Sequence, residues 1–188
     1  MADGRARDGS FEAIAASLLD AVALKRVARA GWVRRGVEAP ESVAAHSWGV
    51  AWLVVALAPP GLDRGRALEY AVLHDLAEAR VGDLTPADGV PAEEKHRREA
   101  AGLREIVRGL PGGEALAAVW ERYERQEDAE ARFVRQCDRL DMAVQAVAYA
   151  RETGEDLGEF LASAAKVIED EALRGVLEVL TRWERDEA

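Results

Sequence analysis

Apolar residues recur at every third or fourth position along nearly the whole chain. The pattern is clear over residues 11–22, where Ser10 is placed to cap a helix. No run of alternating β-branched residues interrupts it, and a half-buried strand would need that period of two. The sequence therefore predicts an all-α fold.

Proline and glycine divide this periodic chain into separate helices. Pro59 and Pro60 end a predicted helix over residues 43–58, because proline does not continue a helix. A second apolar stripe predicts a helix over residues 64–79, and residues 82–91 carry the Gly, Asp-Gly and Pro that are typical of a loop. Further helices are expected over residues 91–110, around 116–123, and over 129–151, 157–168 and 171–184.

The chain has the length of one domain. Its 188 residues, 49% of them hydrophobic, are expected to bury about 70% of the surface of the unfolded chain. We expect residues 1–9 to form a loose lead-in and residues 10–188 to form a single domain. Its motifs lie in residues 24–150, and its C-terminal helices in residues 155–186.

Cysteine content and hydropathy predict a cytoplasmic protein with no membrane partner. Cys137 is the only cysteine, which excludes an intrachain disulfide and a multi-cysteine zinc site and favours a reducing compartment. The longest apolar run, residues 50–58, is far shorter than the roughly 20 residues that span a bilayer.

The chain is acidic, with 35 Asp and Glu against 25 Lys and Arg and a formal net charge of -10. Such a balance argues against binding a nucleic acid polymer, which needs a basic surface. Residues 21–37 nevertheless carry five positive charges and no acid, which suits a phosphate group. Two interpretations of Trp32 in this segment stay open: a flat face for a sugar or base, or an anchor in the core below a solvated basic loop.

Histidines and acids are placed for a metal site. His74 and Asp75 are adjacent, and Glu78 follows His74 by four residues, which on a helix puts both on one face. His46, on the predicted helix over residues 43–58, is expected to close the site from another helix.

A carboxylate on the predicted helix over residues 129–151 completes this set. Asp138 and Asp141 both lie on or beside its apolar stripe, and their spacing does not choose between them. A buried carboxylate needs a cation. Two imidazoles and two carboxylates suit Mn, Co, Fe, Ni or Zn better than Ca.

Simpler roles are open for each of these residues. A helical histidine is more often a cap or a partly buried residue than a ligand, and His96 is expected on a solvated charged face. The simpler role for Asp138 is an ion pair with Arg135 or Arg139. The simpler role for Glu78 is that of a surface acid at the end of a helix. If these simpler roles hold, the chain is a non-catalytic helical interaction module whose acids and arginines are surface charges.

The ordered combination of these motifs resembles the HD-domain superfamily, named for its His-Asp metal doublet, and more narrowly its 5'-deoxynucleotidase family. The resemblance covers about residues 24–150 and implies a single HD-domain helical bundle. The segments that carry it are residues 24–33 (LKRVARAGWV), 40–46 (PESVAAH), 73–78 (LHDLAE), 81–88 (VGDLTPAD), 93–99 (EEKHRRE) and 133–138 (FVRQCD).

The resemblance also implies a role for particular residues. The implied metal ligands are His46, His74, Asp75 and Asp138. The implied catalytic acid is Glu78, and the implied nucleotide contacts are Arg29, Trp32 and Asp83. A second, harder ion such as Mg is implied at Glu78, Asp83 and the carbonyl of Leu84.

The activity that the resemblance implies is removal of the 5'-phosphate from nucleoside 5'-monophosphates, with deoxyribose preferred. It also implies a homodimer, for which Trp120 or Trp183 is a candidate interface residue. A phosphatase of the same fold acting on a modified nucleotide in nucleoside-antibiotic biosynthesis is an open alternative. Histidine-rich two-metal HD enzymes are disfavoured because they need at least four histidine ligands and the chain has three histidines.

Overall fold

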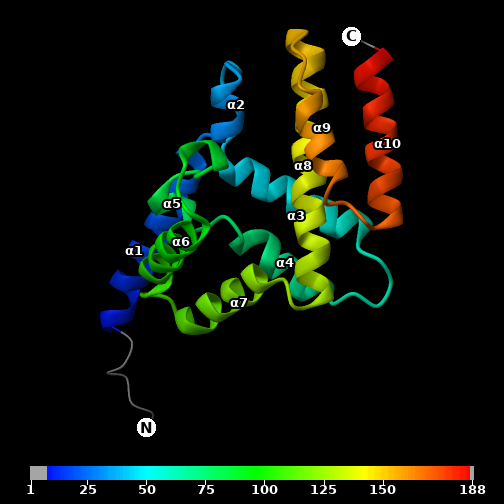
Figure 1. The fold of residues 1–188 in the computed structure, drawn as a ribbon. Coiled ribbons are helices and arrows are strands. Elements are labelled where there is room, and N and C mark those ends of the chain that lie inside the picture. The colour runs from blue at the N-terminus through cyan, green and yellow to red at the C-terminus, as the bar shows by residue number, and fades with distance from the viewer. Residues whose placement is uncertain (1–7, 187–188) are drawn as a thin grey trace. The chain divides into compact units, whose positions relative to one another are not determined.

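The computed structural model of the chain describes residues 8–186, and the regular structure of this part is helical (Figure 1). An isolated bridge between Ala28 and Ser42 is its one β-type pairing. The all-α prediction is therefore confirmed. The elements in chain order are α1 (Asp8–Val22), η2 (Ala23–Arg26), α2 (Ala30–Arg34), α3 (Val43–Leu57), α4 (Arg64–Leu73), α5 (Glu78–Val81), η3 (Pro86–Asp88), α6 (Ala92–Val107), α7 (Gly113–Arg125), α8 (Ala129–Thr153), α9 (Gly158–Ala165) and α10 (Glu171–Asp186).

The helices group into two compact units. Within the described part of the chain, the first unit comprises residues 8–45 together with Val72–Arg125, and the second comprises His46–Ala71 together with residues 126–186. Across residues 8–186, no helix has both the length and the apolar character needed to cross a membrane.

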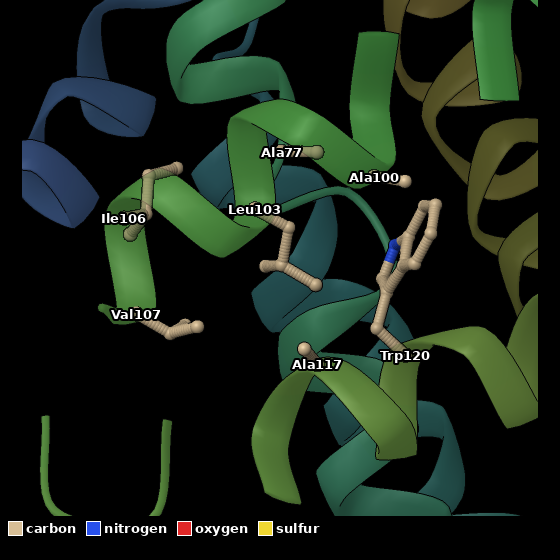
Figure 2. Packing of buried hydrophobic residues seen from close by; sticks show 7 residues of the cluster. All are labelled: Ala77, Ala100, Leu103, Ile106, Val107, Ala117 and Trp120. Carbon is tan, nitrogen blue, oxygen red and sulfur yellow. The ribbon is translucent and has the colours of Figure 1, made fainter. Parts of the chain in front are cut away.

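The core of the first unit lies among α5, α6 and α7. Short side chains on α6 and α7 allow the helices to approach closely, and the indole of Trp120 fills the space beside Ala77 and Ala100 (Figure 2). This core supports the turn that precedes α5, which carries His74 and Asp75. The buried members of the cluster are Ala77, Ala100, Leu103, Ile106, Val107, Ala117 and Trp120.

The second unit is built around α8, which packs against α9 and α10 (Figure 1). Asp128 fixes where α8 begins, because its side chain accepts a hydrogen bond from the amide of Ala131 at 2.7 Å. The hydroxyl of Tyr70 donates to the other oxygen of Asp128 at 2.6 Å. These two bonds set the register of α8 and hence the position of its acidic residues.

Most predicted helix boundaries agree with the structure. The helix expected over residues 43–58 is α3, and the one expected over 129–151 is α8. The N-terminus differs, because α1 begins at Asp8, two residues before Ser10. Ser10 is therefore not the capping residue, and the expected lead-in is helical at residues 8 and 9; residues 1–7 lie outside the described part of the chain.

The single helix predicted over residues 64–79 is wrong, since α4 ends at Leu73 and α5 starts at Glu78. The backbone between them makes bonds of the i to i+3 type, including the amide of Glu78 to the carbonyl of Asp75 at 3.0 Å. Residues three apart then share a face, as in a 3-10 helix. Glu78 is therefore aligned with Asp75 rather than with His74.

Candidate metal centre

In the first unit, His74 and Asp75 lie together at the turn between α4 and α5. His74 is buried, and its Nε2 lies 3.3 Å from Asp75 Oδ2. Two residues of α7 hold the histidine: Trp120 donates from Nε1 to the carbonyl of His74 at 3.0 Å, and Tyr123 meets its ring edge-on at 5.8 Å. Two ligand atoms so close together can contact one ion.

Glu78 is the buried acid of this group, with 3% of its surface exposed. Burial, and then the neighbouring charges of Asp75 and Asp83, raise the pKa of Glu78 to about 10, while Arg29 and Lys95 oppose the shift. Its Oε2 is buried and has no hydrogen-bond partner among the described residues. The charges of Asp75 and Asp83 are matched by those of Arg29 and Lys95, and Glu78 stays protonated near neutral pH.

Arg29 lies against the same acids. Its Nη1 is 3.5 Å from Asp75 Oδ2 and 3.8 Å from Asp83 Oδ2, and its side chain is largely shielded from solvent. Asp83 also accepts a hydrogen bond from the amide of Ala30 at 2.8 Å, at the start of α2. The guanidinium is thus held next to the acids of the site, where it can meet a bound anion.

Trp32 is only 2% exposed, and its indole donates to Glu41 Oε1 at 2.9 Å. The flat face that the sequence offered to a sugar or base is therefore not at the surface. This burial fits the anchor in the core, and the role of Trp32 as a nucleotide contact stays a prediction. The amide of Trp32 also bonds the carbonyl of Arg29 at 3.2 Å, so this anchor fixes the turn that presents the arginine.

The loop over residues 82–91 is tied to helices on either side. Arg34 donates to Thr85 and, at 2.6 Å, to Asp88, the two residues that form a capping box around η3. Lys95 donates from Nζ to the carbonyl of Leu84 at 2.9 Å. The resemblance implies that the carbonyl of Leu84 binds a second ion, but in this structure that carbonyl accepts a hydrogen bond from Lys95.

His96 is only partly as predicted. It is half-exposed rather than fully solvated, and its ring stacks on Trp120 with centroids 5.3 Å apart. Its two nitrogens face Glu121 and Glu124 at 3.4 and 3.7 Å. Trp120 itself is buried in the core of the first unit, so it is not a candidate for an interface.

In the second unit, His46 lies between two carboxylates of α8. The histidine is fully buried; its Nε2 is 3.2 Å from Asp138 Oδ1, and its Nδ1 is 2.8 Å from Asp141 Oδ2. Arg139 is also near Asp138, at 3.7 Å. The sequence treated Asp138 and Asp141 as competitors, whereas the structure uses both, one on each ring nitrogen.

The residues of each unit fit a divalent transition ion. Each unit presents a buried imidazole with a carboxylate oxygen 3.2–3.3 Å from its Nε2, which is a nitrogen and oxygen donor set that Mn, Co, Fe, Ni or Zn accepts. The buried Oε2 of Glu78, which has no hydrogen-bond partner among the described residues, also favours a cation.

Several residues of these clusters were not predicted from sequence. Glu41 accepts a hydrogen bond from Trp32, and Lys95 donates one to the carbonyl of Leu84. In the sequence, both look like ordinary charged residues of the surface. Trp120 contacts the site through its indole nitrogen, whereas the sequence offered it as a candidate interface residue. The sequence offered Asp138 and Asp141 as alternatives for one place and did not predict that both lie beside His46.

The HD domain is the protein family whose model matches this chain, over residues 21–179. The chain therefore belongs to the HD-domain family, which confirms the resemblance seen in its His-Asp motif. Within that family, the chain is similar to curated proteins named 5'-deoxynucleotidase, the narrower group that the sequence predicted.

The 5'-deoxynucleotidase HDDC2 of Homo sapiens is 44% identical over 128 residues, which cover 67% of this chain and 63% of that protein. The match thus spans less than two thirds of that relative. The protein of the same name from Danio rerio is 37% identical over 161 residues, covering 84% of this chain and 80% of that protein. The crystal structure of the PH0347 protein from Pyrococcus horikoshii OT3 has a TM-score of 0.75 and 30% identity, covering 89% of this chain and 98% of that one.

Proposed function

We propose that this chain is a metal-dependent phosphohydrolase that removes the 5'-phosphate from deoxynucleoside 5'-monophosphates. The observation that carries the proposal is the buried cluster of His74, Asp75 and Glu78 with Arg29 against it. A cation site beside a shielded guanidinium suits a phosphate dianion. The similarity to proteins named 5'-deoxynucleotidase supports the nucleotide substrate.

The ion is proposed to be held by His46, His74, Asp75 and Asp138. Membership of the HD-domain family supports a divalent ion, and the donor atoms favour a transition metal. When bound, such an ion polarises a phosphoryl oxygen and lowers the pKa of a water molecule that can attack phosphorus.

Glu78 is proposed to protonate the departing 5'-oxygen of the sugar. Its raised pKa favours the protonated form that a general acid requires. A bound cation opposes the contributions of Asp75 and Asp83 but leaves the burial in place. The pKa of Glu78 then falls from about 10 toward the range in which a general acid works near neutral pH.

Arg29 is proposed to bind the phosphate, and Asp83 the sugar 3'-hydroxyl. The short distances from Arg29 to both acids support a phosphate position next to the ion. Trp32 is proposed as a nucleotide contact that forms a tight wall beside the sugar, and its buried indole also supports the turn that carries Arg29. A missing 2'-hydroxyl is selected by exclusion more easily than by attraction.

A second ion, such as Mg, remains a proposal at Glu78, Asp83 and the carbonyl of Leu84. Lys95 competes with it, because its ammonium group lies 2.9 Å from that carbonyl. We also propose a homodimer in the cytoplasm. The half-exposed Trp183, with Arg151 placed 5.0 Å from the centre of its ring, is a candidate interface residue.

The proposed activity is tested by phosphate release from a panel of deoxy- and ribonucleoside 5'-monophosphates. After treatment with EDTA the protein should be inactive, and Mn²⁺ or Co²⁺ should restore release, with deoxynucleotides preferred. A protein that takes up no ion and releases no phosphate would instead be the helical interaction module.

Arg29→Ala should weaken the use of substrate by about 1.5–3 kcal/mol, the value of a hydrogen bond to a charged group. The loss should appear in kcat/KM, while the metal content stays at the wild-type value. Arg26→Ala is the matched control, because Arg26 is an exposed base of the same segment. Equal kinetics for the two variants would make Arg29 an ordinary surface charge.

A further inference from the structure

Asp141 touches the buried imidazole of His46 on the nitrogen that faces away from Asp138. The bond from His46 Nδ1 to Asp141 Oδ2 is 2.8 Å long, and Asp138 lies on the Nε2 side at 3.2 Å. An ionised carboxylate can only accept a hydrogen bond. His46 therefore carries a proton on Nδ1, and Nε2, on the Asp138 side, is the nitrogen left to bind an ion.

Gly49 provides the space that Asp141 occupies. It follows His46 by three residues on α3, so it lies on the same face of the helix. A Cβ atom at this position would lie 2.0 Å from Asp141 Oδ1 and 2.7 Å from its Cγ, well inside van der Waals contact. Any side chain at position 49 would displace the carboxylate from His46.

A glycine inside a helix normally costs stability, about 0.5–1 kcal/mol relative to alanine. Gly49 lies within α3, where its backbone gives no reason for glycine: its φ is not in the left-handed region. The contact with Asp141 is the feature that requires it. Gly49, Asp141 and His46 therefore form one arrangement on two facing helices.

We propose that Asp141 is a positioning residue for the metal: seated against Gly49, it holds His46 with its proton on Nδ1 and its Nε2 directed to the ion. The inference rests on the proposed metal site, in which His46 is a ligand. Without a partner on Nδ1, either ring nitrogen can carry the proton, and a proton on Nε2 blocks the ligand atom. Partners of this kind change metal affinity about 10–100-fold in other proteins.

A titration with Co²⁺, followed by the absorption of the bound ion, tests this role in the full chain. Asp141→Ala and Gly49→Ala should each weaken binding about 10–100-fold. The double variant should bind no more weakly than Asp141→Ala, because no carboxylate remains for the new methyl group to displace. Gly175→Ala is the matched control: it is also a helical glycine of the second unit, but its Cβ would meet open space, so affinity should not change.

A second measurement does not depend on the ion. In metal-free protein, the ring ¹⁵N shifts of His46 should show a proton on Nδ1, and both single variants should lower the share of rings that carry it. Assignment is simple because the chain has three histidines. Asp141→Asn keeps the shape and one acceptor oxygen, so it should retain the Nδ1 tautomer and lose less affinity than Asp141→Ala; it also serves if the alanine variant does not fold.

The outcomes separate this inference from the proposed function. If His46→Ala binds Co²⁺ as well as the wild type, the proposed ligand set is wrong, and the role of Asp141 toward the metal is overturned with it. Wild-type affinity together with an unchanged tautomer in Asp141→Ala would overturn the inference. Additive losses in the double variant would also overturn it, since Gly49 would then act independently of Asp141.

Discussion

His74→Ala is expected to leave the purified protein without its divalent ion and to abolish metal-dependent phosphate release. His74 supplies a buried nitrogen 3.3 Å from Asp75 Oδ2, and alanine removes that donor while leaving the acids behind. Elemental analysis should find near one equivalent of a transition metal in the wild type and none in the variant.

The fold of this variant should survive. Trp120 donates a hydrogen bond to the backbone carbonyl of His74, which alanine retains. The hydrogen bond between α7 and the turn before α5 is therefore unchanged. His96→Ala is the control, because it removes a half-exposed imidazole that faces two glutamates of α7. Full metal occupancy in His74→Ala, with helical circular dichroism intact, would remove His74 from the ligand set.

The helices of this protein were largely predictable because their apolar residues repeat with the helical period. That period sets which face of α3 or α8 is buried, and proline fixes where α3 must end. It did not reveal the break between α4 and α5, since residues 74–77 continue the apolar pattern through a turn of i to i+3 bonds. The difference matters because it pairs Glu78 with Asp75.

The sequence predicted which residues form the candidate site better than it predicted which atoms of these residues contact one another. The adjacent His74 and Asp75 are visible in the sequence, and the structure keeps them together. The sequence did not show that Asp138 faces Nε2 of His46 while Asp141 faces Nδ1, because this depends on how the imidazole ring is oriented. For Trp32 the sequence left a ligand face and a core anchor both open, because the burial of a side chain depends on packing against residues distant in sequence.

Glu78→Gln is expected to lower turnover about 10²–10⁴-fold, the usual contribution of a positioned acid or base. Glutamine keeps the size of the side chain but cannot transfer a proton. The transition-metal content should remain near one equivalent, because the four proposed ligands are intact. If Glu78 mainly held a second ion, raising the concentration of Mg²⁺ should recover much of the lost rate; wild-type turnover would remove Glu78 from the mechanism.

The same substitution should stabilise the metal-free protein, and the gain should grow with pH. In the folded chain the pKa of Glu78 is raised from its ordinary 4.5 to about 10, chiefly by burial. Between these values the folded state holds a proton that the unfolded state has released, so the free energy of unfolding falls as pH rises. Glutamine never ionises, so this contribution to the fall is absent from the variant.

The gain is measured by thermal unfolding in EDTA at several pH values above 4.5, as the difference in Tm between Glu78→Gln and the wild type. Glu99 and Glu124, whose pKa values burial also raises, are present in both proteins and cancel in that difference. A difference that stays constant with pH would mean that Glu78 ionises normally in the folded chain. It would then lack the raised pKa on which its role as a proton donor depends.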